Sequence, residues 1–437
     1  MRPPQTQRRL MRLGLLLVMA LTPCALTVQA QHVHHAPSYQ VLTLEDCIGL
    51  GLDKQPAVIA ARASLAAAQA GLQGIDNLGC VARCLAKDID IRREQAVRGV
   101  AIATGGVVTA EFETRYAVTR NYFSTMYAMA QHDVLKRVVE RIESMRKQAK
   151  DLLKLGDPKL KITAIDLLKL ELAVKEYKTR SIEAEVGMKK AIAALREAMG
   201  FDAGFCFAVY PIPLPDVQPT YELCALIDMA LSRRGEMAQA ALAYQVTTLE
   251  VNAQGVKKGL QVNTFAKAGD PHANPIPTGV SNKDYRPGAI GLETPPYLAG
   301  HKADRVARAQ ELNNRAGAVV LKTRNLISLE TEVMYYKWEE SYRKAAGLKE
   351  LRELAGKLIK SVQDEFVQGS IDGGEYLKTN AQEEKIQSEL NEALYTHVLA
   401  LAALERVTAG GFRPDYSRRP GKDLPGKDLP VPEKMIP

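Results

Sequence analysis

The stretch LTLEDCIGLGLDKQPAVIAARASLAAAQAGLQG, at residues 42–74, reads as a helix that starts at Thr43, a break at Pro56 and a second, alanine-rich helix. A similar stretch, YELCALIDMALSRRGEMAQAALAYQVTTLEVNA, returns at residues 221–253. Both stretches are dominated by residues with high helix propensity. This recurrence predicts a chain that is one helical unit written twice.

The placement of proline predicts two very long helices. No proline lies between Pro56 and Pro158, or between Pro296 and Pro414. Because a proline inside a helix costs about 3 kcal/mol, such runs permit uninterrupted helices. We expect helices at 88–155 and 302–368, each about 100 Å long. Their apolar residues recur every three or four positions, as in a coiled-coil seam: Leu135, Val138, Ile142, Met145, Ala149 and Leu152 in one, and Leu348, Leu351, Ala355, Leu358 and Val362 in the other.

Each long helix is followed by a glycine-containing turn and a returning helix. The returning helices are expected at 164–200 and 374–410, and Gly200 and Gly410 would cap their C-terminal ends. The fold class is therefore mainly α, with duplicated long antiparallel helical hairpins. The predicted segments are a first structural repeat at 42–209, a stiff Pro-rich linker at 210–219 and a second structural repeat at 220–410.

Helices of this length cannot bury their apolar stripes inside one compact domain, so they must pack against equally long partners. Small residues, among them Gly105 and Ala316, would allow close helix approach. Two readings follow from the periodicity. One is an exported coiled-coil scaffold or adaptor in the periplasm that does not span the outer membrane. The other is a helical tube made of several copies of the chain.

The order of these motifs resembles that of the TolC-like outer-membrane efflux proteins. The opening stretch looks like the first two helices of that family, and the pairs DLLKLELA…ALREAMG and EYLKTNAQ…AALERVTAG look like its descending helices. The resemblance covers nearly all of 42–410, twice over. It implies an α-barrel protomer of a homotrimer, with a small β-barrel portion in the lipid of the outer membrane. It also implies most of the chain in the periplasm, a periplasmic adaptor and an inner-membrane pump as partners, and passive export of solutes in efflux or type I secretion.

The membrane end departs from the family pattern. The second repeat offers a β-hairpin at about 260–294, with strands at 260–268 and 289–294, whereas 74–94 in the first repeat is short and does not alternate. A membrane-spanning strand needs about 9–11 residues. The β-barrel portion could therefore be reduced.

The turns supply the candidate site residues. By resemblance, the turns form the closed periplasmic end of the tunnel, where acidic side chains would gate passage and the tips would dock the adaptor. Helix capping is the alternative role for acids at the start of a returning helix, and the two roles can coexist. The gating candidates are Asp157, Asp166, Asp372 and Glu375, and the docking candidates are Gly156, Gly369 and Ser370.

The N-terminus reads as an export signal at 1–30, with a basic region, the apolar run 13–26 and VQA before cleavage after Ala30. Lipidation at Cys24 is the alternative, although Pro23 departs from a lipoprotein box. The tail at 31–41 contains His32, His34 and His35, which are weak metal candidates because no carboxylate or thiol cluster completes a site.

The remaining features of the sequence give no support for nucleic-acid binding or catalysis. Residues 1–30 carry four arginines and no acid, so the net charge of +8 falls to +4 without them, and no basic stripe with aromatics indicates nucleic-acid binding. Cys80 and Cys84 form a loop disulfide or stay as two thiols. The tail at 411–437 is Pro-rich and predicted to be disordered. No catalytic constellation and no cofactor motif stands out, so an enzyme is only a remote third reading.

Overall fold

The computed structural model describes residues 40–416, except for residues 80–83, 85, 156–160, 217, 219–220, 257–289, 291–297 and 299. Several predicted features lie outside this part of the chain. They are the signal at 1–30, the three histidines, Cys80, Gly156, Asp157, the strands at 260–268 and 289–294 (apart from Ile290), and the tail from residue 417 onward.

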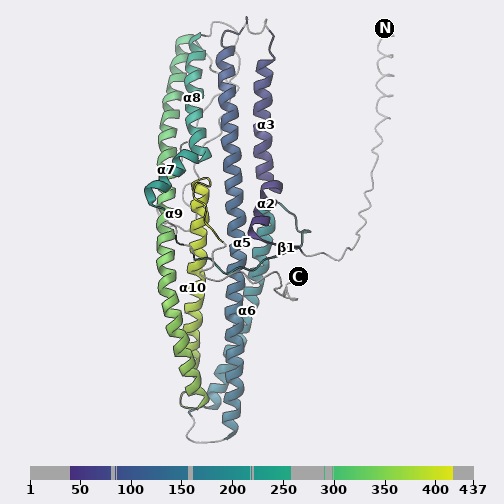
Figure 1. The fold of residues 1–437 in the computed structure, drawn as a ribbon, viewed down its shortest axis with the longest axis vertical. Coiled ribbons are helices and arrows are strands. Elements are labelled where there is room, and N and C mark those ends of the chain that lie inside the picture. Colours follow the sequence, from purple (N-terminus) through teal and green to yellow (C-terminus); the bar gives the residue numbers. More distant parts are fainter. Residues whose placement is uncertain are drawn as a thin grey trace, which may run out of the picture. The chain divides into compact units, whose positions relative to one another are not determined.

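The first repeat begins and ends in a short strand, and four helices are described between the two strands (Figure 1). Its elements are β1 (Gln40–Leu42), α2 (Leu44–Lys54), α3 (Pro56–Asp76), α5 (Ile89–Leu155), α6 (Ala164–Ala198) and β2 (Phe207–Val209). The two strands pair in parallel, with Gln40 opposite Phe207 and Leu42 opposite Val209. This pairing joins the N-terminal end of the repeat to its C-terminal end.

The second repeat has the same order of helices without the strands among its described residues. Its elements are α7 (Leu223–Arg233), α8 (Gly235–Val256), α9 (Lys302–Val367) and α10 (Gly373–Val407). The predicted long helices and returning helices are confirmed, with ends that differ by at most three residues. Pro56 occupies the first turn of α3, where its missing N–H costs no hydrogen bond.

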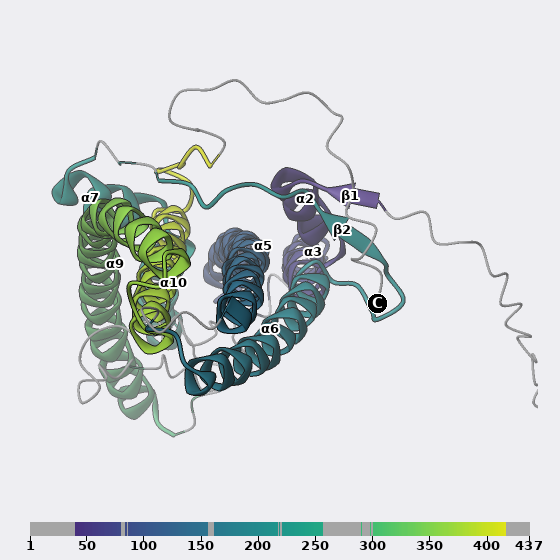
Figure 2. The ribbon, with the colours of Figure 1, turned by 90° about the horizontal axis from the view of Figure 1, so that it is seen from below.

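The long helices form two antiparallel hairpins that lie against each other. Along most of their length α5 packs on α6 and α9 packs on α10, and α10 also contacts α5. In Figures 1 and 2, α9 lies at one side of this row next to α10, and the upper half of α6 lies at the other side next to α5. The shorter helices α3 and α8 pack on the first half of α5, and α8 also packs on α9.

The predicted seam of α5 is buried against α6. Leu135, Val138, Ile142, Met145 and Ala149 are each at most 8% exposed and belong to one apolar cluster with residues of α6, α9 and α10. The seam of α9 behaves differently. Leu348 and Ala355 are buried, but Leu351 and Leu358 are 48% and 47% exposed. Within the described chain, α10 therefore does not cover the whole apolar stripe of α9.

A glycine pair sets the closest helix contact in the upper half. A Cβ atom on Gly235, at the start of α8, would lie 2.3 Å from the carbonyl oxygen of Gly105 in α5. A side chain therefore cannot fit at this position without separating the two helices. This agrees with the expectation that small residues allow close helix approach.

The linker between the repeats lies on both hairpins. Residues 210–216 contain neither helix nor strand, as expected for this Pro-rich segment. The Tyr122 hydroxyl on α5 donates to the carbonyl of Tyr210 at 2.7 Å, and Lys349 on α9 forms an ion pair with Asp216. The linker is thus held at one end by the first repeat and at the other by the second.

None of the helices in the described ranges is both long enough and apolar enough to cross a lipid bilayer.

Candidate functional site at the hairpin turns and helix edges

The turn before α6 is built by a capping box. The Thr163 amide donates to Oδ2 of Asp166 at 3.0 Å, and the Asp166 amide donates to the Thr163 hydroxyl at 3.3 Å. Asp166 is only 3% exposed and also accepts from Lys169 at 3.2 Å. Burial would raise the pKa of Asp166, but the hydrogen bonds from Thr163 and Lys169 hold this pKa below its ordinary value.

The turn before α10 uses the same positions with different residues. Asp372 is the N-cap and accepts from the Glu375 amide at 2.9 Å. Glu375 occupies the position in α10 that Asp166 occupies in α6, but its side chain is not buried. Capping therefore accounts for Asp166 and Asp372, whereas the carboxylate of Glu375 stays available to solvent.

The two turns contact each other within one chain. The Lys161 amide donates to the carbonyl of Gly369 at 3.0 Å. A Cβ on Gly373 would lie 2.8 Å from Cβ of Asp166, so the start of α10 rests directly on this buried acid. Ile162 and Ile371 are buried in the same apolar cluster. These contacts tie the two hairpins together at this end.

The predicted docking residues are only partly described. Gly369 follows the C-cap of α9 and is buried, while Ser370 is exposed and donates its amide to the carbonyl of Glu365 at 2.9 Å. Ser370 is thus the one docking candidate in the described chain that presents its side chain at the tip.

A buried ion cluster, which the sequence analysis missed, joins helices of both repeats. Glu330 of α9 is fully buried and accepts from both Arg234, at the α7–α8 junction, and Arg406 of α10. Arg406 also pairs with Glu113 of α5, and Arg234 donates to Glu236 at 3.0 Å. Burial would lower the pKa of Arg406, but Glu330 and Glu113 raise it above its ordinary value.

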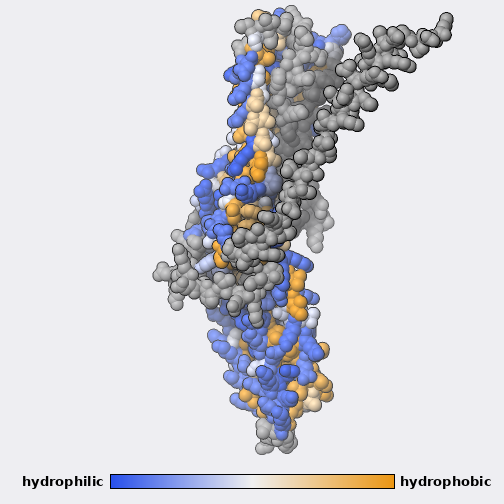
Figure 3. Space-filling model, turned by 90° about the vertical axis from the view of Figure 1, so that its right-hand side faces the viewer, coloured by the Kyte–Doolittle hydropathy of each residue, from blue (hydrophilic) through white to orange (hydrophobic). Residues whose placement is uncertain are grey.

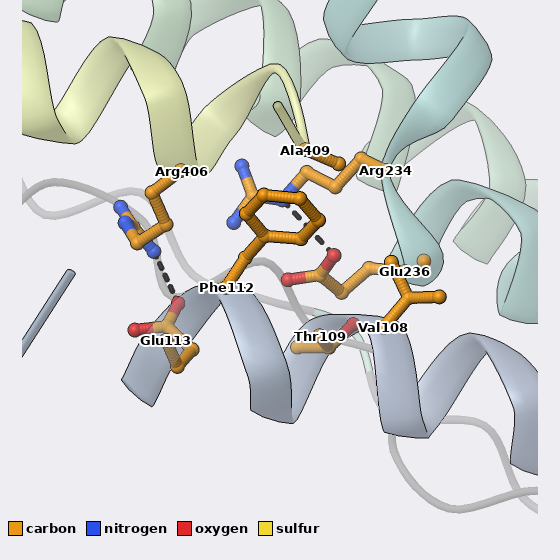
Figure 4. A pocket seen from close by; sticks show the side chains of 9 residues that line it. Val108, Thr109, Phe112, Glu113, Arg234, Glu236, Arg406 and Ala409 are labelled. Carbon is orange, nitrogen blue, oxygen red and sulfur yellow. Dashed lines mark hydrogen bonds and ion pairs between the residues drawn. The ribbon is translucent and has the colours of Figure 1, made fainter. Parts of the chain in front are cut away.

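The space beside this cluster is too small for a substrate. Figure 4 shows Phe112 lying between the Arg406–Glu113 and Arg234–Glu236 pairs. The cavity that these side chains line has a volume of about 10 Å³, which is room for about one water molecule. We therefore assign the cluster to helix packing and not to ligand binding.

Helices α6 and α9 expose apolar side chains that no other part of the described chain covers. Ile165, Leu168 and Leu172 on α6 are 63%, 65% and 68% exposed, and Leu354 on α9 is 62% exposed. Figure 3 shows such hydrophobic patches on a mainly hydrophilic surface in the lower half of one side. Exposed apolar patches of this kind mark surfaces at which another chain can bind.

Within the described residues, no group of three or more His, Cys, Asp or Glu side chains is arranged to hold a metal ion. Cys84 is exposed, but its predicted partner Cys80 lies outside the described part, so the pair stays a prediction.

Comparison with known proteins matched no family model and no curated protein. Solved structures do match over most of the chain. The outer-membrane channel OprN shares 13% identity at a TM-score of 0.66, covering 85% of this chain and 91% of that one. A membrane protein from Pseudomonas aeruginosa shares 13% identity at a TM-score of 0.65, covering 84% and 92%. The outer-membrane protein VceC from Vibrio cholerae shares 12% identity at a TM-score of 0.63, covering 85% and 97%. At the level of the fold, these likenesses confirm the resemblance to TolC-like outer-membrane efflux proteins.

Proposed function

From the fold that this chain shares with outer-membrane channels, we propose that it is a channel subunit in the outer membrane of an efflux or type I secretion system. Three copies would join their paired hairpins into one helical tube in the periplasm. The tube would pass solutes outward as a passive conduit and would perform no chemistry on them.

The uncovered apolar edges of α6 and α9 are the observation that carries this proposal. A monomeric rod would leave Leu168, Leu172 and Leu354 in water, whereas a closed ring of copies buries one edge against the next. Burying each leucine stabilises the assembly by about 1.5–3 kcal/mol relative to leaving it exposed.

The proposed partners meet the tube at the hairpin turns. A periplasmic adaptor linked to an inner-membrane pump would contact the tips, where Ser370 and Glu375 are exposed. Gly156, Asp157 and Gly369 complete the docking and gating candidates by their places in the two turns. OprN, VceC and the Neisseria gonorrhoeae outer-membrane channel MtrE support a channel role by analogy of fold.

Purification from membranes tests the proposal. We expect recovery with outer-membrane fractions, a detergent-solubilised mass of three chains by light scattering, and single-channel conductance in planar bilayers. A soluble periplasmic protein without conductance would instead support the coiled-coil scaffold.

The gating role of the turns has its own test. We propose that Asp157→Asn with Asp372→Asn raises the conductance, because removing both charges weakens the polar closure while asparagine still caps α10 as well as aspartate does. Asp364→Asn, at an exposed position near the end of α9, is the control. An unchanged conductance in a correctly assembled double variant would leave capping as the only role of Asp372.

A further inference from the structure

The two repeats differ most at the end opposite the hairpin turns. In the first repeat, α3 ends at Asp76 and α5 begins at Ile89, so twelve residues connect them. In the second repeat, α8 ends at Val256 and α9 begins at Lys302, so forty-five residues connect them. Elsewhere the helices of the two repeats match in order and nearly in length.

The first connection is closed by contacts that lie directly beside it. Arg93 of α5 pairs with Asp76 of α3 at 2.6 Å. Ile75, Ile89 and Ala96 are buried together between the same two helices. The helical hairpin therefore stays packed up to its end. Two membrane-spanning strands need about 9–11 residues each, which twelve residues cannot supply.

The second connection leaves and returns at one polar cluster. Gln254, near the end of α8, donates to Glu250 at 2.7 Å and accepts from Arg305 of α9 at 2.9 Å. Arg305 also donates to the carbonyl of Gly300 at 2.7 Å. The chain before residue 255 and after residue 299 is thus fixed at the same place, and the length between them accommodates two strands and a turn.

This cluster also includes the start of α5. Arg92, which is 1% exposed, donates to Asp88 at 3.1 Å and pairs with Glu250. Burial would raise the pKa of Glu250, but the hydrogen bonds from Arg92, Gln95 and Gln254 hold this pKa below its ordinary value. The charged cluster anchors the base of the second connection to the first repeat.

We propose that the first repeat of each subunit ends on the periplasmic side of the outer membrane, and that only the second repeat extends into it. This inference rests on the proposed channel function. Three subunits would then contribute six strands, fewer than the eight of the smallest bacterial outer-membrane barrels. The outer end of the tube is therefore not an ordinary closed barrel made by three copies alone.

Cysteine labelling in intact cells tests the proposal on the full-length chain. With Cys80, Cys206 and Cys224 replaced by serine, exposed Cys84 is the reactive thiol near the first connection, while Cys47 is fully buried and is kept. The matched variant carries Cys84→Ser and Asn274→Cys, which moves the thiol to the second connection. The reagent is a polyethylene-glycol maleimide too large to cross the outer membrane.

We expect Cys84 to react only after the outer membrane is permeabilised, and the Asn274→Cys variant to react in intact cells. Equal labelling of both purified variants in detergent establishes that each thiol is accessible. Labelling of Cys84 in intact cells would overturn the one-sided membrane contribution and leave the channel proposal standing. Labelling of neither variant until permeabilisation would overturn the membrane placement itself, and with it the proposed function.

Discussion

At the scale of single residues, Glu330 has the most demanding environment in the described chain. It is fully buried and balances two guanidinium groups, Arg234 and Arg406, that come from separate helices. Removing a charge from water is costly, and the cost is recovered only when every partner is present. The cluster therefore links α9 and α10 to the α7–α8 junction through a single carboxylate.

Glu330→Gln is expected to destabilise the subunit by about 3–5 kcal/mol, because two buried guanidiniums lose their shared counter-charge. Thermal unfolding followed by circular dichroism measures the effect. Glu111→Gln is the control, since Glu111 pairs with Arg62 where both side chains are at least one-third exposed, and the change there should stay within about 1 kcal/mol. A similar loss of stability in both variants would show that the buried ion cluster contributes no more than an exposed ion pair.

At the scale of the elements, the returning helices of the two repeats correspond cap by cap. Thr163 caps α6 and Asp372 caps α10, 209 positions apart. The returning helices end at the C-caps Met199 and Thr408, separated by the same interval. Leu195 and Leu404, also 209 positions apart, are both fully buried one turn before these caps.

Helix ends could be predicted because they depend on residues nearby in the sequence, namely proline, glycine and capping residues. The ion cluster could not, because its members come from positions far apart in the chain, with no common spacing. One signal was present: Glu405 and Arg406 interrupt the apolar run LALAALERV at 399–407, and a charged side chain that is buried in such a run requires a partner. The exposure of Leu351 and Leu358 could not be predicted for another reason. The period identifies an apolar stripe but does not show which helix covers each part of it.

Gly200→Ala tests the packing of one repeat's end against its beginning. Gly200 has a φ of +79°, and a Cβ there would lie 2.6 Å from the carbonyl carbon and oxygen of Lys54. The left-handed conformation alone costs about 1–2 kcal/mol for alanine, and the clash adds to this. Gly71→Ala, in the interior of α3 with open space around it, should instead stabilise the helix by up to about 1 kcal/mol. Equal unfolding midpoints for the two variants would contradict the close contact.

At the scale of the whole assembly, the decisive feature is which apolar surface a single subunit leaves uncovered. The buried face of α6, which includes Leu170 and Val174, points into the hairpin pair. The opposite face carries Ile165, Leu168 and Leu172 in solvent. A helix that is apolar on two opposite faces needs a neighbour on each face. The described part of the subunit covers only one of these faces of α6. The second neighbour must therefore come from another chain, and we propose that it is another copy.

Leu172→Glu is expected to separate the copies without unfolding them. The substitution removes about 1.5–3 kcal/mol of apolar burial and places a charge in the contact, so association at each interface should weaken at least about tenfold. Lys147→Glu is the matched control. Lys147 lies at an exposed position of α5, which packs against α6 and α10, so the substitution adds an acid to the same hairpin without changing the exposed face of α6. The detergent-solubilised mass over a dilution series measures association, and far-ultraviolet circular dichroism confirms that the helices persist. If Leu172→Glu keeps the mass of the unmodified protein at every dilution, the α6 edge does not join the copies, and the tube must close through another surface.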